Sequence, residues 1–469
     1  MSLSPEVETL FATLRQTAAK PEVARVIEKH VQEAPDRELS RINPLAFATR
    51  HDVDAEQVIA TYLHAARLGI FELAWNVFCP SCSGVLESTA TLKSIKHVQY
   101  TCAFCDASYE PKLDEVVEVT FTVSPRVRRI AAHEPNTLPV WEYYRQVFWS
   151  SGIELPDDAT FNKIINDTTL DATDLPPGGK AILSLQLPDT SVILCDPVVH
   201  TSQLLNVKGE ATRERQNLNF VLTKGQGPVS AAQMRPGAIR IAIENRTNQR
   251  TIPTVWIAND ALHALLAARR PYLTAKHLLT NQTFRDLYRT ETLDVDQRLK
   301  ITSLTFLFTD LKGSTELYDR VGDLAAFDLV NQHFRVLNEI VAAESGAVVK
   351  TIGDAMMATF PTPDRALTAA LEMRKAIHDL NQDLLVKIGI HEGPCLAVVL
   401  NERQDFFGQT VNIAARVQGL ADSHGILATR QIVENAAAAR MLKKSGITPM
   451  PQNRPLRGIS DRMTIYEIP

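Results

Sequence analysis

The apolar residues of this chain change their spacing along the sequence, and the changes divide it into regions that cannot share one fold. Helical spacing runs through residues 1–69, and a short strand-like piece, IFELAWNVF, follows it. From about residue 116 short strand-like segments such as VVEVTFTV and AIRIAIEN alternate with Pro, Gly and Asn turns. From residue 301 strand and helix patterns follow in the order β-α-β-β-α-β, which is typical of ferredoxin-like folds. A chain of 469 residues is also too long for one core, so the sequence predicts a multidomain α+β protein.

We expect five segments in chain order. The helix–helix–strand order of residues 1–78 favours a winged-helix-like domain, and residues 79–115 carry the spacing of a zinc ribbon. Residues 116–265 are expected to form a β-rich, antiparallel, sandwich-like domain. Residues 266–300 are interpreted as a connector, and residues 301–469 as the ferredoxin-like domain.

Four of the six cysteines stand in two pairs, CPSC and CAFC, with 19 residues between them. Four thiolates at this spacing are typical of a closed, tetrahedral zinc site, so one structural Zn²⁺ per chain is expected. The alternative is redox pairing within either CxxC motif. A catalytic metal is not expected, because four thiolates leave no open position. The predicted ligands are Cys79, Cys82, Cys102 and Cys105.

Charge and hydropathy limit the classes of partner. The formal net charge is −5, and residues 1–120 carry 17 acidic against 11 basic residues. Binding to nucleic acid needs a basic face, so we do not expect it, although a zinc-dependent DNA-binding regulator is the alternative for the front half. The start MSLSPEVETLF lacks the pattern of a signal peptide, and no run approaches the roughly 18 apolar residues of a membrane span. We therefore expect a cytoplasmic protein without a membrane partner.

Two aspartates stand in comparable positions in the last region. Asp310 ends the strand SLTFLFT, and Asp354 lies in the turn of KTIGDAMMA. If these strands are neighbours, the two carboxylates converge and repel each other, and oxygen-binding cations such as Mg²⁺ or Mn²⁺ would relieve the repulsion. The residues after Asp310 are expected to open a helix whose free N–H groups can hold a phosphate. By itself this loop also fits an ordinary capped helix start; it contains Lys312, Gly313, Ser314 and Thr315.

A third polar set lies in the segment DFFGQTVNIAAR. Asn412 and Arg416 are four residues apart and so share one face of the predicted helix. An amide and a guanidinium group on one face suit a hydroxyl and a phosphoryl oxygen. The alternative is an exposed polar pair on an ordinary amphipathic helix.

Together these motifs make residues 301–469 resemble the catalytic domain of the class III adenylate/guanylate cyclases. The matching segments are FTDLKGST, KTIGDAMMA, DFFGQTVNIAAR and the final LRG. The resemblance implies that Asp310 and Asp354 hold two Mg²⁺ or Mn²⁺ ions, with assistance from the Leu311 carbonyl. It also implies that Asn412 orients the ribose and that Arg416 stabilises charge on the α-phosphate.

The resemblance also assigns the base. Lys350 and Asp405 would read the purine edge, and a lysine facing N1 with an aspartate facing the amino group suits adenine, so ATP is the predicted substrate. Arg457 stands where the family usually has a phosphate-binding lysine, and Pro394 stands where many relatives have a basic residue that Lys312 would replace. A guanylate cyclase is the enzymatic alternative, and a catalytically silent nucleotide-sensing module is the non-enzymatic one.

In this family the metal ligands and the base-reading residues of one site come from two subunits. The chain contains each set once, so the resemblance implies a symmetric homodimer with two shared sites. The front half resembles an uncharacterised regulatory region that precedes cyclase domains in some bacterial proteins. That resemblance implies control of the catalytic domain by an unknown small-molecule or protein effector.

Overall fold

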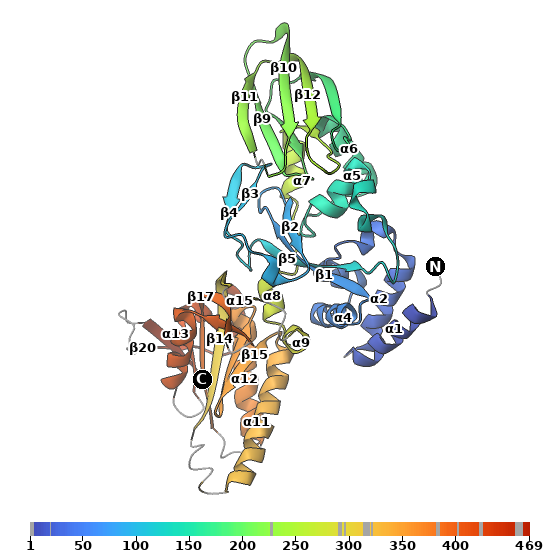
Figure 1. Ribbon diagram of the computed structural model, residues 1–469. Helices are drawn as coiled ribbons and strands as arrows, with labels where there is room; N and C mark the ends of the chain where they lie inside the picture. The colour runs from blue at the N-terminus through green and yellow to red at the C-terminus, as the bar shows by residue number, and fades with distance from the viewer. Residues whose placement is uncertain are drawn as a thin grey trace. The chain divides into compact units, whose positions relative to one another are not determined.

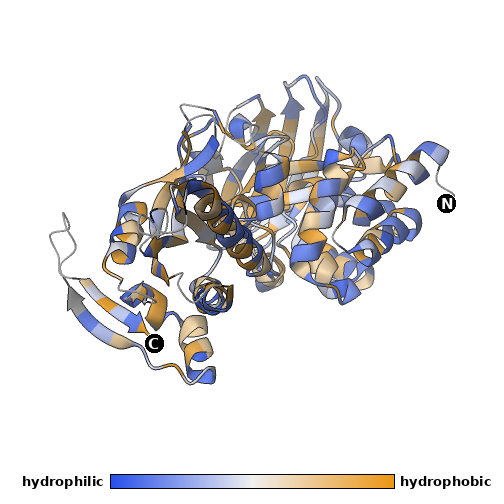
Figure 2. Ribbon diagram, turned by 90° about the horizontal axis from the view of Figure 1, so that it is seen from below, coloured by the Kyte–Doolittle hydropathy of each residue, from blue (hydrophilic) through white to orange (hydrophobic). Residues whose placement is uncertain are grey.

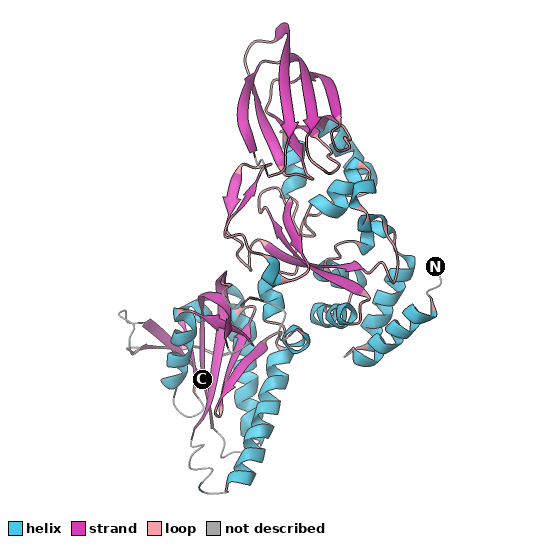
Figure 3. Ribbon diagram, in the orientation of Figure 1, coloured by secondary structure: helices cyan, strands magenta, loops and turns pink. Residues whose placement is uncertain are grey.

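The computed structural model contains helices and strands throughout, so the mixed helix and sheet class expected from the sequence is confirmed (Figure 3). It divides into two compact units. Figure 1 colours the ribbon by residue number along the chain. The N-terminal unit comprises Met1–Pro111 and Glu115–Leu273, and the C-terminal unit comprises Lys112–Asp114 and Thr274–Pro469. The described residues are 4–18, 20–225, 228–288, 293–294, 297–312, 319, 322–380, 385–400, 403–421, 425–454 and 463–469. None of the described helices combines the length and apolar content needed to cross a membrane.

The first helices begin where side chains cap their free N–H groups. Ser4, Asn43 and Asp54 each accept backbone hydrogen bonds at a helix start. Hydrophobic and hydrophilic residues are interspersed along the helices near the N-terminus, as expected of helices that bury one face (Figure 2). The following strands form a three-stranded sheet in the order β2-β1-β5. These elements are α1 (Pro5–Thr17), α2 (Pro21–Glu33), α3 (Pro44–His51), α4 (Ala55–Arg67), β1 (Phe71–Phe78), β2 (Val85–Thr89) and β5 (Val117–Val123). The winged-helix interpretation stays a prediction.

The middle of the N-terminal unit contains two sheets that share one apolar core. One has the order β10-β12-β7 and the other β11-β9-β8-β13-β6. The pairs β10–β12 and β11–β9 are parallel, so the expected antiparallel arrangement is wrong at these positions. Parallel neighbours need a crossover, and here the chain crosses to the other sheet between them. The strands are β6 (Thr169–Ala172), β7 (Lys180–Leu187), β8 (Val192–Asp196), β9 (Thr201–Val207), β10 (Thr212–Leu222), β11 (Pro228–Met234), β12 (Gly237–Asn245) and β13 (Thr254–Ile257).

Helical segments flank these sheets and cover a second core around Trp149 and Trp256. They are α5 (Val140–Tyr143), the π-helical turn η5 (Tyr144–Phe148), α6 (Asp158–Thr168) and α7 (Asp260–Ala267). A short hairpin of β3 (Tyr100–Cys102) and β4 (Ala107–Tyr109) carries the second cysteine pair.

The C-terminal unit is built on one sheet in the order β15-β16-β14-β17-β19-β21-β20, with β18 paired to β17. Its first elements follow the predicted β-α-β-β-α-β order. They are β14 (Leu299–Lys312), α11 (Asp323–Ala343), β15 (Ala347–Ile352), β16 (Ala355–Phe360), α12 (Pro363–Leu380) and β17 (Leu385–Leu400). The later elements are β18 (Arg403–Phe407), α13 (Gln409–Gly419), β19 (Ile426–Thr429), α14 (Arg430–Glu434), α15 (Ala436–Lys444), β20 (Met450–Arg454) and β21 (Met463–Ile468).

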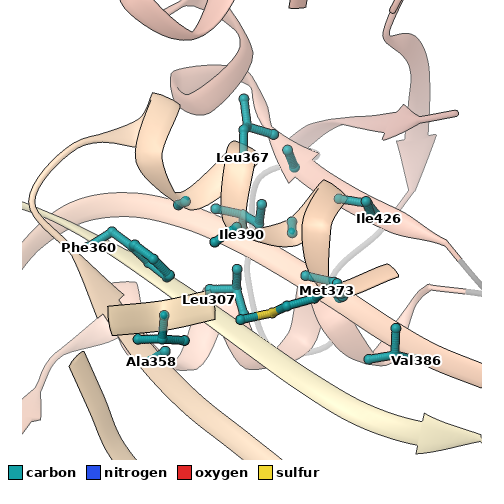
Figure 4. Close-up of a cluster of buried hydrophobic side chains, with 14 of the residues drawn as sticks. Leu307, Ala358, Phe360, Leu367, Met373, Val386, Ile390 and Ile426 are labelled. Carbon is teal, nitrogen blue, oxygen red and sulfur yellow. The ribbon is translucent and has the colours of Figure 1, made fainter. Parts of the chain in front are cut away.

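Helices cover both faces of this sheet. Leu307, Phe360 and Met373 meet in the core between the sheet and α12 (Figure 4). On β19, Ile426 belongs to this core, whereas the next residue, Leu427, packs with α13. Successive side chains of a strand point to opposite faces, so α13 covers the other face of the sheet.

The segment expected to be a connector also contributes helices to the C-terminal unit, α8 (Ala275–Leu279) and α9 (Gln282–Leu287). Residues 112–114 belong to the same unit. The Asp114 carboxylate accepts hydrogen bonds from the backbone N–H groups of Thr302 and Ser303, where the β14–β17 ladder is irregular. The five domain boundaries expected from the sequence stay a prediction.

Candidate active site

Asp310 and Asp354 lie at one edge of the sheet because β14 and β16 are paired neighbours. Thr309 pairs with Met356, and Asp310 and Asp354 follow at the end of this ladder. Gly353 takes a left-handed conformation (φ 64°) in the two-residue turn between Ile352 and Ala355, and this turn holds Asp354. The strand order therefore brings the two predicted metal-binding carboxylates together.

The electrostatics of this pair fit a divalent cation. Burial raises the pKa of the Asp310 carboxyl and the nearby Asp354 raises it further, whereas Lys387 and a hydrogen bond from Gln418 lower it. Asp354 Oδ2 is buried and has no hydrogen-bond partner among the described residues. Two close carboxylates, one of them with an oxygen that accepts no hydrogen bond from the described residues, are a donor set that suits Mg²⁺ or Mn²⁺.

The helix α13 presents Asn412 and Arg416 to solvent on one face, while Ile413 and Val417 are buried against the sheet. The helix lies very close to β17, because a Cβ added at Gly389 would stand 2.1 Å from the backbone nitrogen of Gln418. Among the described residues, neither the Asn412 nor the Arg416 side chain has a hydrogen bond or ion pair. Both side chains are exposed, so a ligand can reach them.

Lys350 and Asp405 form the third predicted pair, and they are in direct contact. Lys350 Nζ donates to Asp405 Oδ2 at 2.5 Å, and Asp405 Oδ1 accepts a hydrogen bond from the Phe406 N–H. The Lys350 side chain is 40% exposed and that of Asp405 is 8% exposed. The strands that carry them, β15 and β18, are not paired with each other, so side chains rather than backbone ladders join them.

Two residues of α9, in the segment expected to be a connector, support this pair. Arg285 Nη2 donates to the carbonyl oxygen of Gln404 at 2.9 Å and more weakly to that of Val349, the residues directly before Asp405 and Lys350. Gln282 Oε1 accepts from the Val348 N–H at 2.8 Å. Burial lowers the pKa of Arg285 to about 10. No sequence periodicity could have found these contacts, because they depend on how α9 packs.

For several predicted site residues the structure gives no contact that bears on the predicted role. Gly313, Ser314, Thr315 and Arg457 lie outside the described residues. Lys312 is exposed at the end of β14, and Leu311 beside it is buried. Their assigned roles stay predictions.

The four paired cysteines converge in the N-terminal unit. Their Sγ atoms all lie within 4.8 Å of one another, and those of Cys82 and Cys102 are 3.6 Å apart. A tetrahedral zinc site with Zn–S bonds of about 2.3 Å places sulfur atoms about 3.8 Å apart, so the arrangement fits Zn²⁺. The cysteines also shift one another's acidity: hydrogen bonds from Cys102, Cys105 and Cys82 lower the pKa of Cys79. No disulfide joins them in the described chain.

Two family models match the chain. The one described as "Adenylate and Guanylate cyclase catalytic domain" matches residues 297–466, and "Family of unknown function (DUF5939)" matches residues 4–286. Both base specificities occur among the similar proteins. An adenylate cyclase of Anabaena cylindrica is 28% identical over an alignment of 185 residues, and the match covers 35% of this chain and 36% of that protein. Guanylate cyclase 32E of Drosophila melanogaster is 28% identical over an alignment of 151 residues, and the match covers 28% of this chain and 13% of that protein.

Among solved structures, the adenylyl cyclase CyaB from P. aeruginosa is 22% identical, with a TM-score of 0.33. The similarity covers 37% of this chain and 95% of that one. The chain spans little more than a third of the length of the Anabaena protein and less of the Drosophila protein.

Proposed function

The chain belongs to the DUF5939 family over residues 4–286 and carries an adenylate and guanylate cyclase catalytic domain over residues 297–466, and from this premise we propose that it is an adenylate cyclase. The reaction would convert ATP to 3′,5′-cyclic AMP and pyrophosphate, under control of the N-terminal region. The observation that carries the choice of ATP is the contact between Lys350 Nζ and Asp405 Oδ2.

The chemistry of this pair complements adenine. An ammonium group has three donors and a carboxylate only acceptors, so Lys350 can donate to N1 of adenine while Asp405 accepts from its amino group. Guanine carries a hydrogen on N1, so its N1–H donor would face the donors of Lys350, and neither group would have an acceptor. A site built for one hydrogen-bonding pattern can reject the other by about 10⁴.

The edge of the sheet would supply the phosphate chemistry. Asp310 and Asp354, with the Leu311 carbonyl, would hold two Mg²⁺ or Mn²⁺ ions, which when bound lower the pKa of the ribose 3′-hydroxyl and bind the phosphates. On α13, Asn412 would orient the ribose and Arg416 would stabilise charge on the α-phosphate during attack by the 3′-oxygen. The remaining phosphate contacts are assigned to Lys312, Gly313, Ser314, Thr315 and Arg457.

We assign the two halves of each site to different subunits of a homodimer. Asp310 and Asp354 of one protomer would face Lys350, Asp405 and Arg416 of its partner. Mixing two inactive variants tests this arrangement: Asp310→Ala and Arg416→Ala should each be inactive, and exchanged heterodimers should regain one intact site. Continued inactivity after demonstrated subunit exchange contradicts the shared site.

The activity itself is tested with purified full-length protein, Mn²⁺ and either ATP or GTP, with the cyclic products separated by chromatography. We expect cyclic AMP from ATP, and no product from the Asp310→Ala variant. A preference for GTP would favour a guanylate cyclase. Absence of product from either nucleotide would favour a nucleotide-sensing module that uses the same fold.

The four-cysteine cluster is assigned a structural role. Cys79, Cys82, Cys102 and Cys105 would hold one Zn²⁺ with no open position for a substrate. Three of the four cysteines are buried, which also favours a structural rather than a catalytic metal.

A further inference from the structure

A polar cavity of about 400 Å³ lies in the N-terminal unit, and none of the four paired cysteines lines it. Residues of α2, of the turn η1 (Asp36–Leu39), of α3 and of the segment 145–158 line it. Its volume falls within the range of small-molecule sites, about 300–1,000 Å³. Five arginines contribute to its wall: Arg37, Arg41, Arg50, Arg145 and Arg270.

The acidic residues of the wall are already engaged. Asp158 accepts two hydrogen bonds from Arg37, at 2.8 and 2.7 Å, and one from Arg145 at 2.7 Å. Glu38 pairs with Arg50. Asp157 caps α6 by accepting from the Ala159 and Thr160 N–H groups. These acids therefore leave two arginines of the wall without an anionic partner.

Those two arginines are Arg41 and Arg270. Arg41 Nη1 donates to the carbonyl oxygen of Val147, and Arg270 Nε donates to that of Ser151 at 2.9 Å. Within the described chain neither forms an ion pair. Burial lowers the pKa of both, and Arg50 lowers that of Arg270 further. A guanidinium group withdrawn from water without a counter-charge is unfavourable, and a bound anion would relieve this.

Two carboxylates act on these arginines, Glu118 on both and Glu154 on Arg270, but neither forms an ion pair with them among the described residues. Glu118 acts on Arg41 and Arg270 only through space, and its own oxygens accept hydrogen bonds from Ser151 and Asn76. Its pKa is raised by burial. Both arginines therefore line the cavity without an ion pair among the described residues.

The backbone at Arg41 carries a further sign of a built site. Its φ of 46° lies in the left-handed region, which non-glycine residues avoid unless the surrounding structure imposes it. The Arg41 N–H donates to Thr122 Oγ1 at 3.0 Å, and the adjacent Ile42 pairs with Phe121, so β5 holds this conformation. On the same wall, Gln146 Oε1 is buried without a partner in the described residues.

We propose that this cavity binds a small molecule bearing a phosphate or carboxylate group through the guanidinium groups of Arg41 and Arg270, and that it is the effector site of the N-terminal region. Guanidinium forks match both oxyanions bidentately. The effector role rests on the proposed cyclase function, whereas the binding site does not.

Trp149 lines the cavity, so its fluorescence reports on occupancy. Full-length protein, without added divalent metal, is titrated with inorganic phosphate and separately with citrate at constant ionic strength, by tryptophan fluorescence and calorimetry. We expect saturable binding of at least one anion, and the anion preferred identifies the chemical class. Arg41→Gln and Arg270→Gln should each weaken it at least tenfold. Arg246→Gln, at an exposed arginine outside the cavity, should leave it unchanged.

Circular dichroism melts show which variants fold. If the Arg41→Gln variant does not fold, the binding result of the Arg270→Gln variant alone tests the site. No saturable binding of either anion, or equal binding by the Arg270→Gln and Arg246→Gln variants, overturns the site. A cyclic AMP assay with and without the anion then tests the effector role. Binding without any change in rate overturns that role, and a chain that makes no cyclic nucleotide leaves the binding result intact.

Discussion

Replacement of Lys350 by methionine should reduce the use of ATP far more than the use of GTP. The substitution keeps the length of the side chain and removes the ammonium group that contacts Asp405. On the proposed mechanism it also removes the donor to N1 of adenine. A guanine base would lose no comparable bond, because its N1 carries a hydrogen.

The magnitude follows from the kind of bond and its exposure. A hydrogen bond from a charged donor contributes about 1.5–3 kcal/mol, and each 1.36 kcal/mol is tenfold in rate. The Lys350 side chain is 40% exposed, so water can partly replace the bond, which favours the lower half of this range. We therefore expect kcat/KM for ATP to fall about 10- to 50-fold, mainly through KM, since base contacts bind substrate and transition state alike.

The assay measures initial rates of cyclic AMP and cyclic GMP formation over a range of each nucleotide. Lys443→Met, at an exposed lysine of α15, is the matched control and should leave both rates unchanged. Thermal unfolding checks that Asp405, now without its partner, does not destabilise the fold enough to account for the loss. Equal losses with ATP and GTP, or an unchanged KM for ATP, would refute the assignment of Lys350 to base recognition.

Three further predictions concern other parts of the chain. Arg285→Gln should raise the KM for ATP with little change in kcat, since it removes the charged donor to the Gln404 carbonyl beside Asp405; saturation kinetics check this. Cys102→Ser should lose the zinc and lower the melting temperature, whereas Cys395→Ser, at a buried cysteine outside the cluster, should keep the metal by elemental analysis. Burial raises the pKa of Asp196 to about 6, above the unfolded value of about 3.9, so stability should fall by up to about 3 kcal/mol as pH rises between these values. Urea unfolding at a series of pH values should show a flatter dependence for Asp196→Asn.

The parts of the site that depend on residues close together in the sequence could be predicted from the sequence. Asp310 lies in β14, and Asp354 directly precedes β16, its neighbour in the sheet. The acid in the glycine turn is visible in the letters, but the expected strand end at Asp310 is wrong, because β14 continues to Lys312 along β17. The cysteine pairs are similar, because each CxxC brings two sulfur atoms together locally and only one long-range contact remains to be made.

Contacts that join distant segments left no such pattern. Arg41 meets the Val147 carbonyl 106 residues away, and Arg270 meets Ser151 at a separation of 119 residues. In the sequence both look like ordinary surface arginines. Only the fold shows that the acidic residues of the same cavity wall are engaged by other groups. The parallel strand pairs of the middle sheets were missed for the same reason, since a strand pattern does not tell to which sheet the strand belongs.

A competition assay tests the central claim most directly. Full-length protein is incubated with Mn²⁺ and equal concentrations of ATP and GTP in one reaction, and both cyclic products are quantified over time. We predict cyclic AMP in large excess, its formation abolished by Asp354→Ala and the excess reduced by Lys350→Met. Cyclic GMP as the main product, or no cyclic product at all, would contradict the account.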